Sequence, residues 1–140
     1  LMDGVIVIRQ LLAADAAVTA LVPASGARPP RLVAGALPQG VALPAIAITS
    51  ISATDHLIPA PGATRRVSER VQVTMAAADY PAVRALARAV KHACAARMPT
   101  VAGLGEVTVQ TDGAGPDFFD EGAAICFRTQ DFLVGFNEAS

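Results

Sequence analysis

The stretch 66–75, Arg-Val-Ser-Glu-Arg-Val-Gln-Val-Thr-Met, is the clearest strand in the chain and decides its fold class. Apolar and polar side chains alternate there, which is the period of a strand with one buried and one solvated face. The apolar positions are Val67, Val71, Val73 and Met75, and the polar ones are Arg66, Ser68, Arg70, Gln72 and Thr74. A sheet built from such strands needs other elements to cover its apolar face.

A helix over residues 2–14 is predicted to provide part of that cover. Val5, Ile8 and Leu11 recur there at helical spacing, so one side of the helix is apolar. A short second helical stretch is expected at 16–22, because the preceding aspartate can accept hydrogen bonds from the exposed amides of a first turn.

The second main helix follows the decisive strand. Asp79 suits its N-cap and Pro81 suits its first turn. An apolar stripe then extends as far as Met98, through Val83, Leu86, Ala87, Val90 and Cys94. The basic residues of this segment fall mostly outside the stripe: Arg84, Arg88, Lys91 and Arg97. The segment therefore predicts an amphipathic helix with a basic outer side.

The remaining strands complete an α+β pattern. They are expected at 31–34, 45–53, 106–111 and 123–136. A proline-stiffened connection is predicted for 55–65, and a turn for 112–117. Ile51 falls on the opposite face from Ile46 and Ile48, which indicates either a strand buried on both faces or a bulge. This order of elements predicts one domain over residues 2–137, with a single mostly antiparallel twisted sheet and two main helices packed on one face.

Composition restricts the class of protein. The chain has 140 residues, of which 53% are hydrophobic and 16% charged, with a net charge of −1. Such a chain can build a core and is not disordered. No clustered basic excess indicates sequence-specific nucleic-acid binding. The apolar run 5–8 is too short to span a membrane, so no membrane partner is expected. So few charges suggest a surface completed by neighbouring subunits.

No constellation of residues argues for catalysis. His56 and His92 have no Cys, Asp or Glu at metal-ligand spacing, so neither a metal nor another cofactor is expected. Cys94 lies on the apolar stripe and is expected to be inert, and both it and Cys126 are expected to be free thiols. The acidic residues around Phe118 and Phe119, namely Asp117, Asp120 and Glu121, are interpreted as a solvated loop with an aromatic anchor. An enzyme is not expected.

Three motifs in this order resemble the tail completion, or tail terminator, proteins of long-tailed bacteriophages. The loop 37–46, Leu-Pro-Gln-Gly-Val-Ala-Leu-Pro-Ala-Ile, resembles that family's entry into its first main strand. The stretch 70–73 followed by the helix starting at 79–86 is similar to its central strand and second helix. The segment 127–132, Phe-Arg-Thr-Gln-Asp-Phe, is similar to its closing strand. The resemblance covers nearly the whole chain.

The resemblance implies a structural role in the virion. Proteins of this family form a ring, typically a hexamer, on the head-proximal end of the tail tube, where they stop polymerisation and offer a joining surface to the head. The implied partners are other copies of the chain, the major tail tube protein and a head-completion or neck protein. The resemblance also implies that DNA can pass through the lumen of such a ring. The implied location is the virion tail, with assembly in the cytoplasm of a bacterial host.

One candidate interface and several alternatives remain open from the sequence. The interface is the proline-stiffened connection with the polar face of the decisive strand: His56, Leu57, Ile58, Arg65, Arg66 and Arg70. A stiff extended segment loses little entropy on binding, which favours such a surface. The alternatives are a head-closure, neck or minor tail protein, a small ligand-binding domain of ferredoxin-like type, and last a small enzyme.

Overall fold

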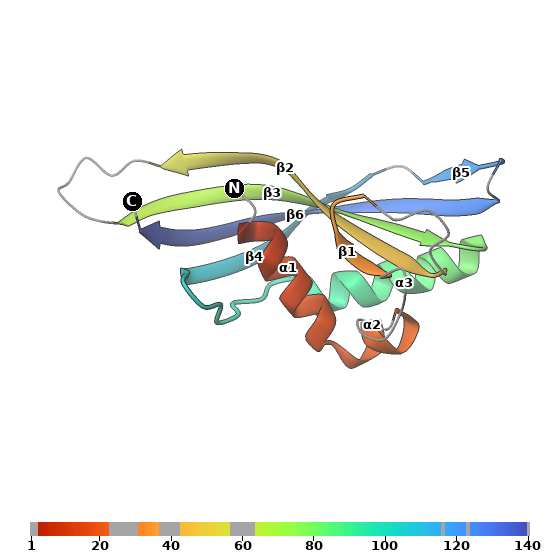
Figure 1. Ribbon diagram of the computed structural model, residues 1–140, viewed down its shortest axis with the longest axis horizontal. Coiled ribbons are helices and arrows are strands. Elements are labelled where there is room, and N and C mark those ends of the chain that lie inside the picture. Colours follow the sequence, from red (N-terminus) through yellow and green to blue (C-terminus); the bar gives the residue numbers. More distant parts are fainter. Residues whose placement is uncertain are drawn as a thin grey trace.

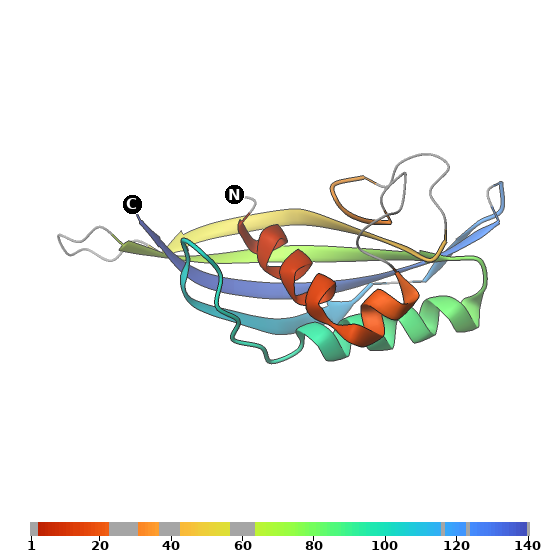
Figure 2. The ribbon, with the colours of Figure 1, turned by 60° about the horizontal axis from the view of Figure 1, so that its bottom comes forward.

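The computed structural model describes residues 3–22, 31–36, 43–56, 64–115, 117–122 and 124–139. Its helices are α1 (Asp3–Ala14), α2 (Ala16–Leu21) and α3 (Tyr80–Cys94). Its strands are β1 (Leu32–Ala34), β2 (Ala45–His56), β3 (Thr64–Ala77), β4 (Gly105–Ala114), β5 (Phe118–Asp120) and β6 (Ile125–Ala139). Helices cover one face of a long twisted sheet, which confirms the predicted α+β class (Figures 1 and 2).

The sheet is built around one long antiparallel pair. Its strand order is β1-β2-β3-β6-β4, with β5 paired to β6 beyond the end of β4. Strands β3 and β6 pair from Thr64 opposite Ala139 to Ala77 opposite Cys126, so the decisive strand of the sequence lies at the centre. All of these pairs are antiparallel except β1 with β2. Strand β1 runs parallel to the first residues of β2.

The β2–β3 hairpin is longer than predicted. Asp55 pairs with Val67 and His56 with Arg66, so both ends of the predicted connection 55–65 belong to strands. That prediction was wrong at its ends, because backbone pairing continues beyond the point where apolar alternation stops. Residues 57–63 lie outside the described part of the chain.

A β-bulge resolves the position of Ile51. The register of β2 against β3 shifts between Ser50 and Ser52, which leaves Ile51 as the extra residue. Its side chain is 52% exposed. Of the two readings that the sequence left open, the bulge is therefore correct.

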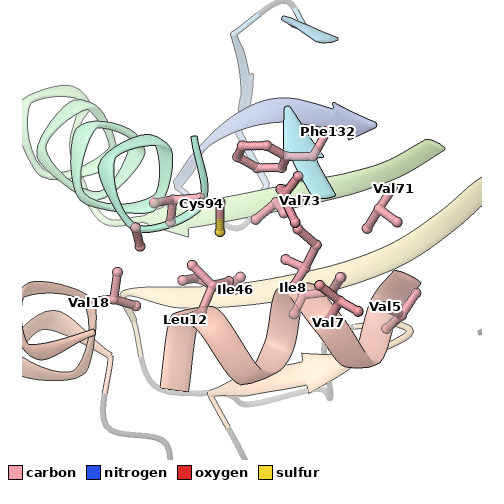
Figure 3. Packing of buried hydrophobic residues seen from close by; sticks show 14 of the residues in the cluster. Val5, Val7, Ile8, Leu12, Val18, Ile46, Val71, Val73, Cys94 and Phe132 are labelled. Carbon is pink, nitrogen blue, oxygen red and sulfur yellow. The ribbon is translucent and has the colours of Figure 1, made fainter. Parts of the chain in front are cut away.

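The core lies between the helices and one face of the sheet. Figure 3 shows Ile8 and Leu12 of α1 facing Ile46, Val73 and Phe132 of the strands. All five are completely buried. Each fully buried side chain of this size contributes about 1.5–3 kcal/mol relative to an exposed one. The apolar stripe of α3 is also buried as predicted at Val83, Leu86, Val90 and Cys94.

Helix α3 ends earlier than predicted. Its last residue is Cys94, and Met98 is 78% exposed instead of lying on the buried stripe. Ala96 takes a positive φ of 53°, which directs the chain out of the helix. The backbone of Arg97 then exchanges two hydrogen bonds with Val109 of β4, at 3.2 and 2.8 Å. Pairing with the sheet therefore replaces the last helical turn.

One carboxylate lies on the apolar face of β3. Glu69 is fully buried, and its Oε1 accepts a hydrogen bond of 3.3 Å from the amide of Gly4 in the first turn of α1. Its Oε2 has no hydrogen-bond partner among the described residues. Burial raises the pKa of Glu69, and hydrogen bonds from Gly4 and Ser50 partly offset this. The side chain joins the start of α1 to the sheet.

Candidate assembly interface

The open face of the sheet carries a hydrogen-bond network centred on Arg66. Its Nη1 donates to the carbonyl oxygen of Glu106 at 2.7 Å and to Oδ1 of Asn137 at 3.3 Å, and its Nη2 donates to Oγ1 of Thr108 at 3.3 Å. The side chain therefore reaches from β3 across β6 to β4. Gly135 leaves the required space, because a Cβ there would lie 2.7 Å from Nη2 of Arg66.

Arg70 forms a second cross-strand tie on the same face. Its Nη2 and Nε donate to Oδ2 of Asp131 on β6 at 2.8 and 3.1 Å, and its Nε lies 3.4 Å from Oδ2 of Asp112 on β4. The hydrogen bond to Asp131 raises the pKa of the Arg70 guanidinium, and the charge of Asp112 adds to this. Arg70 remains 45% exposed, and Leu133, directly opposite on β6, is 38% exposed. This face is thus polar and cross-linked by side-chain hydrogen bonds, and Leu133 is an exposed apolar side chain among the polar ones.

The structure brings together part of the interface predicted from the sequence. Arg66 and Arg70 lie four residues apart on β3, both on the open face, and both guanidinium groups are held within the chain. The backbones of His56 and Arg65 lie at the paired end of the β2–β3 hairpin. Two more predicted residues, Leu57 and Ile58, lie outside the described residues.

The opposite end of the sheet exposes an aromatic cluster. Strand β5 pairs with the start of β6, and the Phe118 ring stacks on Phe127 with centroids 4.8 Å apart and planes 12° apart. Phe118 and Phe119 are nevertheless 50% and 53% exposed. The segment is solvated as predicted, but Phe118–Asp120 form a strand and not a loop, and their rings extend beyond the core.

These rings surround a small pocket at the start of α3. The pocket, about 170 Å³, is lined by Tyr80, Asp117, Phe118, Phe119, Cys126 and Phe127. Tyr80 donates its hydroxyl hydrogen to Oδ2 of Asp117 at 3.0 Å, which ties the hairpin to the helix. Cofactor sites are usually larger than 300 Å³. The pocket is of a size for one protein side chain.

A basic groove adjoins this aromatic end. Arg84, Arg88 and Lys91 of α3 and Arg128 of β6 line a hollow of about 190 Å³, together with Ala87, Ala114 and Gln130. Sequence reasoning placed the three helical residues outside but missed the groove, because Arg128 comes from a distant segment. Their spacing of four and three residues was the available signal.

Among the described residues, none of this geometry resembles a catalytic or metal centre. No group of three or more His, Cys, Asp or Glu residues in that part of the chain is placed to hold a metal ion. Burial raises the pKa of the Cys94 thiol to about 12, so it is not a nucleophile near neutral pH. None of the described helices is long and apolar enough to cross a membrane. The surfaces suit contacts with other proteins.

Fold and surfaces together define a small α+β domain with exposed aromatic and basic surfaces. A family model described as tail completion protein gp17 matches residues 6–124, and the chain belongs to this family. Among solved structures, a chain from the virion of a native gene transfer agent particle has a TM-score of 0.65 and 18% sequence identity. That match covers 93% of this chain and 91% of the other. No curated protein matches. The protein is a structural component of a phage-type tail, and its family points away from an enzymatic role.

Proposed function

We propose that this chain caps the head-proximal end of a phage tail tube as a ring, ends tube polymerisation and forms the surface that joins the tail to the head. Membership of the tail completion family, over residues 6–124, is the observation that carries the proposal. The likeness in fold to a chain of a gene transfer agent virion also supports the proposal, because that chain is part of a virion, as a tail cap would be. Residues 2–137 would act as one domain in this role.

The distribution of exposed apolar side chains supports a subunit with several neighbours. Ile6 and Leu21 are exposed on the helices, Leu133 on the open face, and Phe118 and Phe119 at the aromatic end. Contiguous exposed apolar surface, such as that of the neighbouring Phe118 and Phe119, usually marks a contact with another protein, whereas single exposed side chains are common on any surface. A contact between two different surfaces of identical chains closes into a ring when the rotation allows it.

The proposed partners follow from this role. They are other copies of the chain in a hexameric ring, the major tail tube protein below and a head-completion or neck protein above. We propose that DNA passes through the lumen without sequence-specific contacts, and that assembly takes place in the host cytoplasm. The β2–β3 hairpin end, with His56, Leu57, Ile58 and Arg65, is proposed as a contact surface beside the ordered network of Arg66 and Arg70.

Light scattering behind a sizing column, over a concentration series, tests the ring. A hexamer has six times 14.3 kDa, about 86 kDa, and negative-stain images of it would show a central hole. Because such rings can require a template, the same protein is then added to purified tail tubes. A monomer at every concentration that also fails to bind tubes would refute the proposal. Binding to portal complexes in place of tubes would support a head-closure or neck protein.

A further inference from the structure

The aromatic end of the sheet carries an acidic segment, and a groove lined by basic residues starts beside it. We define the tip as the β5–β6 hairpin segment with Phe119, Asp120 and Glu121, and the groove as Arg84, Arg88, Lys91 and Arg128. The chain as a whole has a net charge of only −1, so this separation is a local feature. Both views of the ribbon place β5 and the start of α3 at the same end (Figures 1 and 2).

Three of the four cations of the groove have no ion-pair partner among the described residues. Among the described residues, no carboxylate forms an ion pair with Arg84, Arg88 or Lys91, and Arg128 alone lies near one, 3.6 Å from Oδ1 of Asp117. Like charges three and four residues apart on a helix repel each other. A binding partner that brings carboxylates to this surface would remove that repulsion.

The tip offers the matching chemistry. Phe119 is 53% exposed and Glu121 is also exposed. The side of the groove nearest the start of α3 contains the Tyr80 ring, with the Arg84 guanidinium 5.8 Å from its centre. A hollow there is lined by Tyr80, Pro81, Arg84, Ala85 and Arg88. An aromatic ring followed by carboxylates therefore complements this surface in residue type and in charge.

Phe119 and Tyr80 of one chain line the same pocket, but the outer end of the tip, at Asp120 and Glu121, lies far from Lys91 of its own chain. Asp117 fixes the base of the hairpin beside Tyr80 through a hydrogen bond of 3.0 Å. Three residues of strand carry Asp120 about 10 Å beyond that point. Eleven residues of helix carry Lys91 about 16 Å from Tyr80, and the ribbon shows α3 running back along the sheet, away from the tip (Figure 2). The match must be made between two molecules.

We propose that the tip of one copy docks into the α3 groove of a second copy. This inference rests on the proposed ring, since it names the contact between neighbouring subunits. Phe119 would pack beside Tyr80 and Pro81 of the neighbour, and Glu121 would face the neighbour's Arg88 and Lys91. The contact joins two different surfaces, as a closed ring requires.

Lys91 is the one lysine in the sequence, which makes the contact directly detectable. Equal amounts of ¹⁴N- and ¹⁵N-labelled protein are treated with a carbodiimide, which joins an amine to a carboxylate only when they touch. The expected product is a mixed-isotope peptide pair that links Lys91 to Asp120 or Glu121. Absence of this pair at every concentration and on tail tubes, or links from Lys91 to other segments only, would overturn the inference.

Charge reversal provides a second test of the proposed contact. Arg84→Glu with Arg88→Glu and Lys91→Glu reverses the groove, whose four cations then become three anions and one cation, and Asp120→Lys with Glu121→Lys reverses the tip. Each variant alone should lose assembly by about tenfold or more, because like charges then face each other. An equal mixture should restore it, since every groove then meets a tip of opposite sign. Arg9→Glu, on the exposed side of α1, is the matched control and should assemble normally.

The outcomes separate this inference from the proposed function. Recruitment to tail tubes without the Lys91 link leaves the capping role standing and refutes the contact. The link without tube recruitment supports the contact and refutes the capping role. Failure of the mixture to restore assembly, or loss of DNA binding as the sole effect of groove reversal, would also overturn the contact, and the latter would assign the groove to DNA phosphates.

Discussion

Strand β6 carries phenylalanines of two kinds. Phe132 and Phe136, near its C-terminal end, are 0% and 1% exposed beneath the helices, whereas Phe127 at its start belongs to the exposed cluster with Phe118. The strand is continuous and the residue type is the same, so the difference lies in what covers each part. Helices cover the first region within the monomer. The second region stays exposed in the monomer, and we propose that another molecule covers it.

This contrast separates folding from assembly. Substitutions in the covered region should change the free energy of unfolding, and substitutions in the uncovered region should change association. A protein that ends a polymer needs both, because it must fold alone and then bind neighbours. The predictions below compare the two regions, from the largest expected change to the smallest.

Phe132→Ala should reduce the free energy of unfolding by about 3–5 kcal/mol, because it leaves a cavity in the covered region. Urea denaturation followed by circular dichroism measures this. Phe119→Ala is the matched variant from the uncovered region. Equal losses for the two would contradict the contrast.

Gly135→Ala should cost about 1–3 kcal/mol through overpacking. The added Cβ would lie 2.7 Å from Nη2 of Arg66 and 2.9 Å from Oγ1 of Thr108, and would displace the tie between β3 and β4. Gly105→Ala is the control, since its Cβ would meet nothing closer than 3.5 Å. Thermal unfolding of both variants measures the difference, and unchanged stability of Gly135→Ala would show that the tie is dispensable.

Glu69→Gln should change the pH dependence of stability. The folded-state pKa of Glu69 is raised above its ordinary value of 4.5, so the unfolded chain releases this proton first as the pH rises. The contribution of Glu69 to stability therefore falls between the unfolded and the folded pKa. The wild-type free energy of unfolding, minus that of the variant, should decline from pH 4 to neutral pH. A difference that rises with pH would contradict the assigned direction.

Phe119→Ala should change the free energy of unfolding by less than about 1 kcal/mol, because half of the ring is already in water. The same change should weaken self-association, measured by the yield of the mixed-isotope link to Lys91. Phe118→Ala is expected to have a somewhat larger effect on folding, since Phe118 stacks on Phe127. If Phe119→Ala associates as strongly as the wild type, the Phe119 ring takes no part in the proposed contact.

Local pattern was sufficient for most of the fold. Alternation at Val71 and Val73, and helical spacing at Ile8 and Leu86, predicted the central strand and both covering helices. These signals are local and repeat with a fixed period. The end of α3 escaped prediction because Arg97 pairs with β4, a contact between segments distant in sequence.

The candidate interface was less accessible to sequence reasoning. Glu69 breaks the apolar pattern of its strand, and its role at the start of α1 depends on tertiary packing. The groove combines α3 with Arg128, and the aromatic end combines Tyr80 with β5, so neither exists until the sheet has formed. Spacing within one segment indicates the basic side of α3 but not the Arg128 that completes the groove.

The most direct test of the account is the length distribution of tail tubes grown with and without the protein. The account predicts that added protein stops elongation, and that electron microscopy shows one ring at one end of each tube. Tubes that keep growing at the same rate, or that carry the protein along their sides with both ends free, would contradict the proposed capping role.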